Sequence, residues 1–427
     1  MLLSLVATFF ITIGIGVPIA FCLGLSGLIA LLVWGKVPMI LIPQRMFTGV
    51  DSFVLMAIPF FILAGELMGT SGILGRLLRF SDLMVGWVRG GLAHINIVAS
   101  MIFAGISGSA VADASALGAA LIPSMRKEYD NEFGSAVCAS AATIGPIIPP
   151  SIPMVVYALT ANVSIAGLFM TGVTPGVLMG LGMMGIAYVI ARRRGYSRRT
   201  EPIPWTERRA RIVRVIPAII MPLIIIGGIL FGVVTPTEAG AIAVLYAVVV
   251  GFFVTGELRF ADFPPALLRS AIATAVVFLL IATSNLVSWL LTAGQVPRIL
   301  GDAIHSVSTS PWVFLLMVNI ALLILGCVLD NLAIMIMIAP ILAPIATTFG
   351  IHPLHFGFVF VMNGVIGMLT PPFGIVLFIV SAIARISLVR LAVNVFPFLI
   401  WQILVLFLVT YVPEVATWLP RLLGYYQ

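Results

Sequence analysis

The chain has 427 residues, of which 61% are hydrophobic and 9% are charged, and its formal net charge is +7. A soluble domain carries roughly 25% charged residues. The composition therefore excludes a soluble globular enzyme, a disordered chain and a disulfide-stapled secreted scaffold. A membrane span needs ~20 apolar residues, which leaves room for about ten to twelve spans plus loops. The sequence predicts a polytopic, all-helical membrane protein.

Apolar stretches follow one another along most of the chain. The first is too long for a signal-peptide core, and we interpret it as retained membrane structure. Several others are too long for one crossing and contain Gly, Pro or Ser breaks, whereas segment 72–89 is typical of an amphipathic helix at the membrane interface. The apolar stretches fall roughly at 2–33, 52–71, 91–125, 133–171, 172–191, 215–234, 237–255, 270–293, 311–349, 356–384 and 391–413.

Positive charge is concentrated in one segment, because nine of the 22 basic residues lie within 192–214. Long apolar runs flank this segment on both sides. The positive-inside rule therefore predicts a cytoplasmic loop over 192–214. A nucleic-acid site or a specific lipid site is the disfavoured alternative, and we expect a lipid bilayer but no nucleic acid among the partners.

The two halves of the chain repeat each other with an offset of about 222 residues. Gly72 matches Gly294, Gly145 matches Gly367, and the pair Pro149–Pro150 matches Pro371–Pro372. The halves meet at the arginine-rich segment, so the second is inverted if each crosses the membrane an odd number of times. Inverted repeats are characteristic of secondary transporters. This geometry predicts that both termini lie outside and that 192–214 lies inside.

Two breaks in each half interrupt the apolar runs at matched positions, namely 104–110 and 143–151, then 325–331 and 365–374. Glycine and Pro-Pro interrupt helices, and a broken helix in lipid is tolerated only where protein or a polar cavity surrounds it. We expect re-entrant hairpins over 104–125 and 325–345 and interrupted helices after them. Freed carbonyls there can bind Na⁺, and freed N–H groups can attract an anion. Proline kinks without a ligand are the alternative.

Four acidic residues at membrane depth are candidates for function. We expect Glu66 to pair with a polar scaffold partner and Glu238 to begin a helix, as structural roles. Asp113 and Asp330 lie beside the breaks, where a role near ion or substrate and a structural role are both open. None of the four break segments contains Lys or Arg. An acidic substrate would therefore need bound cations and helix dipoles, which favours Na⁺ coupling over the lesser alternative of protons.

The chain resembles the large membrane (permease) subunit of TRAP transporters, the DctM-type M subunit. The resemblance rests on Gly105-Ile-Ser-Gly-Ser-Ala-Val-Ala-Asp113 and Ile144-Gly-Pro-Ile-Ile-Pro-Pro-Ser151, and Thr370-Pro-Pro-Phe-Gly374 supports it. It covers essentially the whole chain. It implies an elevator-type, ion-transporter-like fold, not an enzyme, which imports organic acids such as C4-dicarboxylates or sialic acid by Na⁺ symport across the bacterial inner membrane.

The resemblance also implies site residues. The second ion site departs from the first, because Thr370 stands where Ile148 stands in the first half and Val328 stands where Ser107 does. The serines and acids at the hairpin tips serve equally well as helix caps or as ligands. One Na⁺ would lie near Gly105, Ser107, Gly145, Ile148 and Pro150, its mirror near Gly326, Gly367, Thr370 and Phe373, and substrate near Ser109, Asp113, Ser151, Asp330 and Asn331.

The predicted fold and the family resemblance also imply domain limits and partners. We expect a first scaffold and arm over 1–90, transport-domain halves over 91–171 and 311–385, and scaffold over 172–310, with a second arm. Residues 386–427 would add a last scaffold helix. The partners would be a periplasmic substrate-binding protein and a small four-helix membrane subunit, which we expect to be a separate polypeptide. A standalone ion-coupled dicarboxylate carrier is the alternative, and both termini would be periplasmic.

Overall fold

The computed structural model describes residues 1–198, 203–327, 329–372 and 374–426, and throughout these ranges the secondary structure is helical. Within these ranges, seven helices are long and apolar enough to cross a membrane, or eight if the pair bent by 119° at residues 308–310 counts as one. This is fewer than the ten to twelve spans for which the sequence has room. Several apolar stretches instead form shorter helices that end at breaks.

The first half of the chain holds ten α-helices and one short 3₁₀ helix, η1. They are α1 (Leu2–Gly14), α2 (Ile19–Trp34), α3 (Leu41–Val50), η1 (Phe53–Met56), α4 (Ala57–Thr70), α5 (Ile73–Val85), α6 (Gly91–Ser107), α7 (Ala110–Glu128), α8 (Asn131–Ala142), α9 (Ile152–Thr160) and α10 (Ile165–Arg193).

The second half repeats this order after the arginine-rich segment. It comprises α11 (Trp205–Leu230), α12 (Pro236–Val249), the π-helical turn η2 (Val250–Thr255), η3 (Phe260–Asp262), α13 (Phe263–Ala293), α14 (Val296–Val307), α15 (Pro311–Gly326), α16 (Asn331–Thr348), α17 (Pro353–Gly367), α18 (Ile375–Ala384), α19 (Leu388–Tyr411) and α20 (Glu414–Leu422). The predicted amphipathic helix is α5. As expected, Glu238 begins a helix, where it forms a capping box with Thr235.

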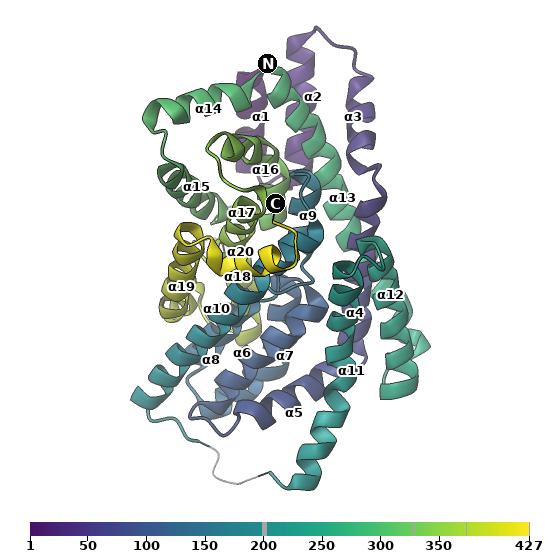
Figure 1. Cartoon of the computed structure of the whole chain (residues 1–427), viewed down its shortest axis with the longest axis vertical. Coiled ribbons are helices and arrows are strands. Elements are labelled where there is room, and N and C mark those ends of the chain that lie inside the picture. The colour runs from purple at the N-terminus through teal and green to yellow at the C-terminus, as the bar shows by residue number, and fades with distance from the viewer. Residues whose placement is uncertain (199–202, 328, 373, 427) are drawn as a thin grey trace.

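The repeat is inverted. Each of α7 to α10 has a counterpart about 222 residues later in α16 to α19. The two amphipathic helices that precede the hairpins, α5 and α14, lie at opposite ends of the molecule, as Figure 1 shows. The same view places the N-terminus at the end opposite the C-terminal end of α10 and the start of α11, and the C-terminus near the middle of the long axis.

Both predicted hairpins form, but they are longer than the sequence indicated. The first consists of α6 and α7 and runs from Gly91 to Glu128, and the second consists of α15 and α16 and runs from Pro311 to Thr348. The expected hairpin ranges 104–125 and 325–345 covered the tips and the second arms, whereas the first arms lie in the apolar stretches that begin at 91 and 311. Both interrupted helices also form, α8–α9 and α17–α18, and each break contains a cis Pro-Pro bond.

The helices pack into two groups. In the first, α13 contacts α2, α3 and α4, and α12 contacts α4. In the second, the hairpins and broken helices pack together with α10, α19 and α20. Packing thus places α10 and α19 beside the hairpins, beyond the sequence-based limits at 171 and 385. The two groups meet where α13 packs on α16 and α4 packs on α6.

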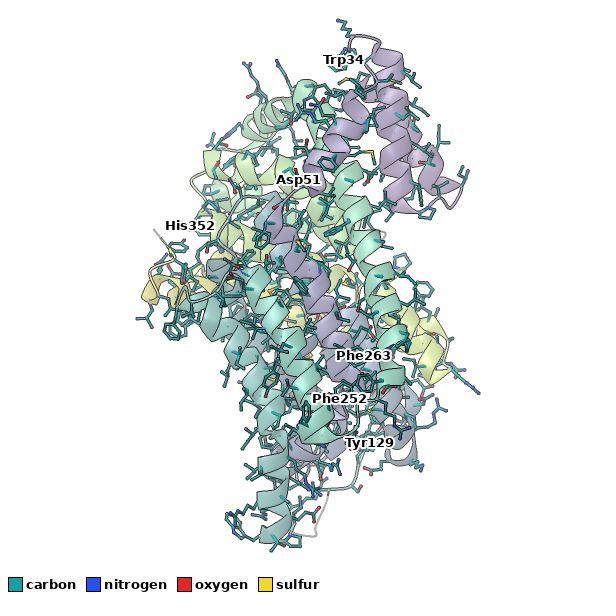
Figure 2. All side chains as sticks on the ribbon, turned by 90° about the vertical axis from the view of Figure 1, so that its right-hand side faces the viewer. Trp34, Asp51, Tyr129, Phe252, Phe263 and His352 are labelled. Atoms are coloured by element: carbon teal, nitrogen blue, oxygen red, sulfur yellow. The ribbon has the colours of Figure 1, made fainter. Side chains whose placement is uncertain are left out.

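Aromatic residues gather near both ends of the scaffold helix α13. Trp34 contacts Trp289 at one end, and Phe252 stacks on Phe263 at the other. Figure 2 shows Trp34 far from Phe252 and Phe263 along the long axis. Aromatic belts of this kind mark the two membrane–water interfaces. The two aromatic clusters are therefore candidates for the two membrane–water interfaces.

Salt bridges anchor both sides of the arginine-rich segment. Arg194 pairs with Asp130 at 2.9 Å, before α8, and Arg211 pairs with Asp82 of α5 at 2.5 Å. The Arg194–Asp130 pair is exposed, whereas the side chains of Arg211 and Asp82 are only 15% and 17% exposed. The contacts support the expectation of a polar loop between the two halves.

Gly182 and Gly185 of α10 provide a matched test of the α10–α19 packing. A Cβ at Gly182 would overlap the indole of Trp401, whereas one at Gly185 would meet no atom within 4 Å. We expect Gly182→Ala to lower the free energy of unfolding by about 1–3 kcal/mol through overpacking. Gly185→Ala should be neutral or stabilising, by up to ~1 kcal/mol, because alanine favours helix. Melting temperatures in detergent check this, and equal shifts in both variants would contradict it.

Candidate functional site

The first hairpin tip is a tight turn held by serines. Gly108 adopts the left-handed conformation, with φ of 58°, between α6 and α7. Ser109 then caps α7, because its hydroxyl accepts a hydrogen bond from the Ala112 N–H at 3.4 Å. A Cβ at Gly108 would lie 2.7 Å from the Pro150 carbonyl oxygen. The tip therefore rests directly on the break between α8 and α9.

Asp113 lies beneath this tip and is fully buried. The Ser107 hydroxyl donates a hydrogen bond to Asp113 Oδ1. Within the described ranges, Asp113 Oδ2 has no partner, and a Cβ at Gly145 would overlap it. The carboxylate thus lies among the residues expected to hold the first Na⁺, rather than with those expected to contact substrate.

The break after α8 brings backbone oxygens to the same place. A Cβ at Gly105 would lie 3.7 Å from the Pro149 carbonyl oxygen and 2.7 Å from the Pro222 ring of α11. Ser151 is buried, donates to the Pro146 carbonyl at 2.6 Å and caps α9 by accepting from the Met154 N–H at 3.2 Å. Its hydroxyl is therefore occupied as a cap. Ile148 is half-buried, next to Gly176.

The mirror site in the second half is built differently. Gly326 and Gly367 approach backbone to backbone, since a Cβ on Gly326 would lie 2.8 Å from the Gly367 Cα. The Thr370 hydroxyl donates to the Ile366 carbonyl at 2.9 Å, which leaves its oxygen lone pairs open to a cation. Phe373, expected in this site, lies outside the described residues.

The second tip carries the polar residues Asp330 and Asn331. The carboxylate of Asp330 caps α16, accepting from the Leu332 N–H at 3.0 Å. Asn331 is 2% exposed, and neither its amide oxygen nor its amide nitrogen has a partner in the described part of the chain. A buried amide without partners is costly, and Asn331 lines the cavity between the tips, which makes it a candidate ligand residue.

A cavity of about 670 Å³ joins the two tips. Its lining includes Ser107 and Ser109 from the first tip and Asp330 and Asn331 from the second. Asp113 and Ser151 are not among the lining residues. Of the five residues expected to contact substrate, the structure brings three to one cavity and places the other two beneath its floor.

Two lining residues were missed as site residues from the sequence. Arg269 of α13 and Glu66 of α4 both line the cavity and form a salt bridge, with Arg269 Nε 2.7 Å from Glu66 Oε2. Glu66 was expected to have a polar scaffold partner, and Arg269 is that partner. The available signal was a single arginine just before the apolar run that begins at residue 270. Such a residue is more simply interpreted as a charge flanking a span.

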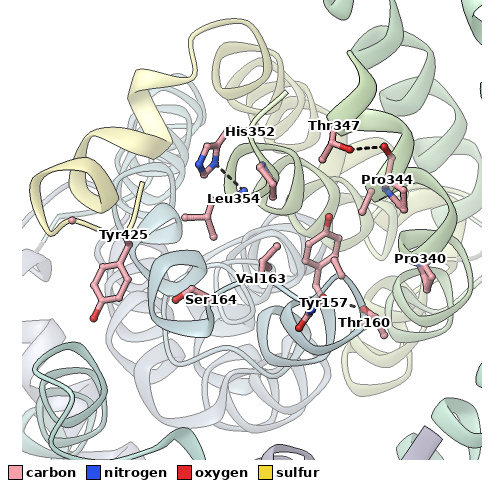
Figure 3. A pocket seen from close by; sticks show the side chains of 15 residues that line it. Tyr157, Thr160, Val163, Ser164, Pro340, Pro344, Thr347, His352, Leu354 and Tyr425 are labelled. Carbon is pink, nitrogen blue, oxygen red and sulfur yellow. Dashed lines mark hydrogen bonds between the residues drawn. The ribbon is translucent and has the colours of Figure 1, made fainter. Parts of the chain in front are cut away.

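A second cavity of about 710 Å³ lies away from the tips. Figure 3 shows Tyr425, near the C-terminus, and Pro340 of α16 on opposite sides of it. His352 caps α17 there by accepting from the Leu354 N–H at 3.2 Å. The residues that line it include no carboxylate, lysine or arginine. This cavity lacks the hairpin tips and the breaks, so we place the candidate site at the first cavity.

The oxygen chemistry of the break segments suits a hard monovalent cation. Transporters coordinate Na⁺ through unwound backbone carbonyls and helix C-terminal ends. Serine and threonine hydroxyls, proline carbonyls and the unpaired Asp113 oxygen supply such atoms here. In the described ranges, by contrast, no group of three or more His, Cys, Asp or Glu side chains could hold a metal ion.

Comparison with known proteins supplies the family. The model of the tripartite ATP-independent periplasmic transporter, DctM component, matches residues 6–415. The chain belongs to the DctM family. This permease is therefore a transporter component and not an enzyme, as the sequence motifs indicated.

Related sequences align with almost the whole length of the permease. The sialic acid TRAP transporter large permease protein SiaM of Vibrio cholerae is 39% identical over 417 residues, which are 96% of this chain and 97% of that protein. The C4-dicarboxylate TRAP transporter large permease protein DctM of Pseudomonas aeruginosa is 38% identical, over 94% of both chains. The isethionate TRAP transporter permease protein DctMQ of Oleidesulfovibrio alaskensis is 38% identical, over 94% of this chain but 63% of that protein.

Solved structures confirm the predicted fold class. The YdaH transporter of Alcanivorax borkumensis superposes with a TM-score of 0.60 at 14% identity, covering 86% of this permease and 89% of that chain. MtrF of Neisseria gonorrhoeae gives a TM-score of 0.58 at 12% identity, covering 88% and 85%. At such low identity the likeness establishes the fold alone.

Ser107 offers a test of the first tip. Its hydroxyl is the partner of the buried Asp113 carboxylate, so we expect Ser107→Ala to lower the free energy of unfolding by about 1–3 kcal/mol. Ser115→Ala is the matched control, because that exposed hydroxyl donates only within its own helix, to the Val111 carbonyl. Melting temperatures in detergent distinguish the two. A shift no larger for Ser107→Ala than for Ser115→Ala would contradict the assigned role.

Proposed function

We propose that this DctM-family permease imports an organic acid by Na⁺ symport, with an elevator movement of its hairpin-bearing helices. The observation that carries the proposal is that three helix N-termini, from both halves of the chain, line one cavity. They belong to α7, α9 and α16, through Ala110, Ile152 and Asn331 respectively. Helix N-termini present N–H groups and partial positive charge, which favour an anion.

Sodium would compensate the negative charge that enters the cavity. The first ion would lie near Gly105, Ser107, Gly145 and Pro150, with the unpaired carboxylate of Asp113 beside them. The second would lie near Gly326, Gly367 and Thr370. Both positions adjoin the hairpin tips, so a bound cation would also order the residues that face the substrate. Such an arrangement couples ion binding to substrate binding by mutual stabilisation.

The proposed moving unit contains both hairpins and both broken helices, 91–171 and 311–385, together with α10, α19 and α20, which pack on them. The proposed fixed unit contains α1 to α4 and α11 to α13. The contacts between the units include close approaches such as that of Gly105 to Pro222. Small residues at such an interface allow one unit to slide along the other with little rearrangement.

We further propose that the permease lies in the bacterial inner membrane, with 192–214 cytoplasmic and both termini periplasmic. The positive charge of 192–214 supports a cytoplasmic loop, and the end of α10 and the start of α11 lie opposite the N-terminus in Figure 1, which supports a periplasmic N-terminus. The partners would be a periplasmic substrate-binding protein and a small membrane subunit on a separate chain. The family description, a component of a tripartite periplasmic transporter, supports both. Sialic acid, C4-dicarboxylates and isethionate, named for relatives, are the candidate substrates.

Uptake into proteoliposomes tests the function. Liposomes containing the permease and its small subunit would receive an inward Na⁺ gradient and labelled N-acetylneuraminate, succinate or isethionate, with and without the binding protein. We expect uptake of one acid that requires both Na⁺ and the binding protein. Na⁺-driven uptake without the binding protein would instead indicate a standalone carrier, and uptake indifferent to Na⁺ would contradict the proposed ion sites.

Thr370 tests the second ion site. Thr370→Val keeps the side-chain shape but removes the hydroxyl oxygen, so we expect the Na⁺ concentration for half-maximal uptake to rise roughly threefold to tenfold. Thr370→Ser keeps the oxygen and should stay close to wild type. The Na⁺ dependence of uptake at saturating acid measures both. If the valine variant matches the serine variant, the hydroxyl is not a ligand.

A further inference from the structure

Arg269 is the only lysine or arginine among the residues described as lining the tip cavity. It comes from α13, on the scaffold side, and faces a space shared with Ser109 and Asn331 of the two tips. The two acidic residues of the same lining are Glu66 and Asp330. An acid that enters the cavity therefore meets two carboxyl side chains and one guanidinium. Arg269 is the side chain whose charge attracts it.

The guanidinium of Arg269 is only partly engaged. Its Nε donates to Glu66 Oε2 at 2.7 Å. Among the described residues, neither terminal nitrogen of Arg269 has a hydrogen-bond or salt-bridge partner. The side chain is 50% exposed, and that of Glu66 is 33% exposed. One edge of the guanidinium is thus held by Glu66, while the edge formed by the two terminal nitrogens is open.

The open edge suits an acid group. A guanidinium presents paired N–H groups at a spacing that matches the two oxygens of a carboxylate, and it also binds other oxyanions. The neighbouring wall is small or apolar, with Gly65 and Gly69 from α4 and Ala273 and Val277 from α13. A Cβ at Gly69 would meet no atom within 4 Å, so space remains beside the ion pair for a ligand.

A purely structural role explains the pair less well. An ion pair this exposed stabilises a protein little, and α4 and α13 already pack against each other through apolar contacts. Charged residues within membrane-spanning helices are costly and usually functional. Glu66 and Arg269 both lie in such helices, and both face the cavity.

We propose that Arg269 binds the acid group of the substrate on the scaffold side of the cavity. Glu66 is its partner while the cavity is empty, and the substrate competes with Glu66 for the guanidinium. This inference rests on the proposed function, and it makes an anionic group a requirement for binding. The helix N-termini of the hairpin tips attract the anion from one side, and Arg269 holds it from the other.

The test measures equilibrium binding to the permease instead of uptake. In an uptake assay the substrate-binding protein sets the apparent affinity for the acid and would mask that of the permease. Equilibrium binding of labelled N-acetylneuraminate, succinate and isethionate to the purified membrane complex, in saturating Na⁺, identifies the acid that wild type binds. For that acid we expect Arg269→Ala to raise Kd at least tenfold and Arg269→Lys to raise it less. Glu66→Gln, which removes the competing charge, should lower Kd severalfold. The Na⁺ dependence should stay unchanged in all three.

Two controls separate binding from a structural role. Arg76→Ala removes an ion pair with Glu257 that is outside the tip cavity, and it should leave Kd unchanged. The charge swap Arg269→Glu with Glu66→Arg keeps the ion pair but inverts its orientation. The swapped variant should keep the wild-type melting temperature. It should not regain the wild-type affinity for the acid, because the guanidinium is then attached to α4 instead of α13.

The outcomes distinguish this inference from the function on which it rests. Wild-type transport of an acid with unchanged Kd in Arg269→Ala would overturn the role of Arg269 and leave the transport function standing. Restored affinity in the swapped variant would show that the pair is structural and would also overturn the role. Absence of binding and of uptake for all three acids in wild type would overturn the function, and this inference with it.

Discussion

Every backbone N–H and C=O group within a bilayer must find a hydrogen-bond partner inside the protein, and the rest of this structure depends on that constraint. Water is absent there, so an interrupted helix survives only where other helices enclose the break. The first hairpin tip is enclosed in this way. Gly108 N donates to the Ala104 carbonyl, and the Ile152 N–H donates to the Gly108 carbonyl across the tip. Backbone N–H and C=O groups at the breaks that have no partner within the protein are the ones available to ions and substrate.

The two halves meet this constraint by different means. In the first, Ser107 and the buried Asp113 fill the space beside Gly145. In the second, Gly326 and Gly367 close the same space by direct backbone contact. Asp113 thus gives the first proposed ion site a carboxylate that the second proposed site lacks among the described residues. Duplicated sequences can therefore preserve a fold while their sites diverge.

Local sequence signals located the helix breaks but not Glu66 and Arg269, which line the opposite side of the tip cavity. Gly, Pro-Pro and Ser interrupt helices through local backbone chemistry, so the hairpin tips and broken helices were predictable at the right residues. The expected hairpin ranges left out the arms before the tips, although the predicted apolar stretches and transport-domain halves begin at the observed hairpin starts, Gly91 and Pro311. The packing of α10 and α19 on the hairpins and broken helices was not predictable from local sequence, since any apolar helix face can pack on several neighbours.

The sequence by itself determined the membrane class, the inverted duplication, the family and the residues at both hairpin tips. The family was identified by the resemblance of the motif residues, and the rest follows from composition, the internal repeat and helix-breaking residues. Only the tertiary structure decided which residues share a cavity. Glu66 and Arg269 are separated by 203 positions yet form an ion pair, and Asp113 lies beneath the cavity rather than in its wall. Such placement depends on how distant helices rotate and pack against one another, which no local pattern specifies.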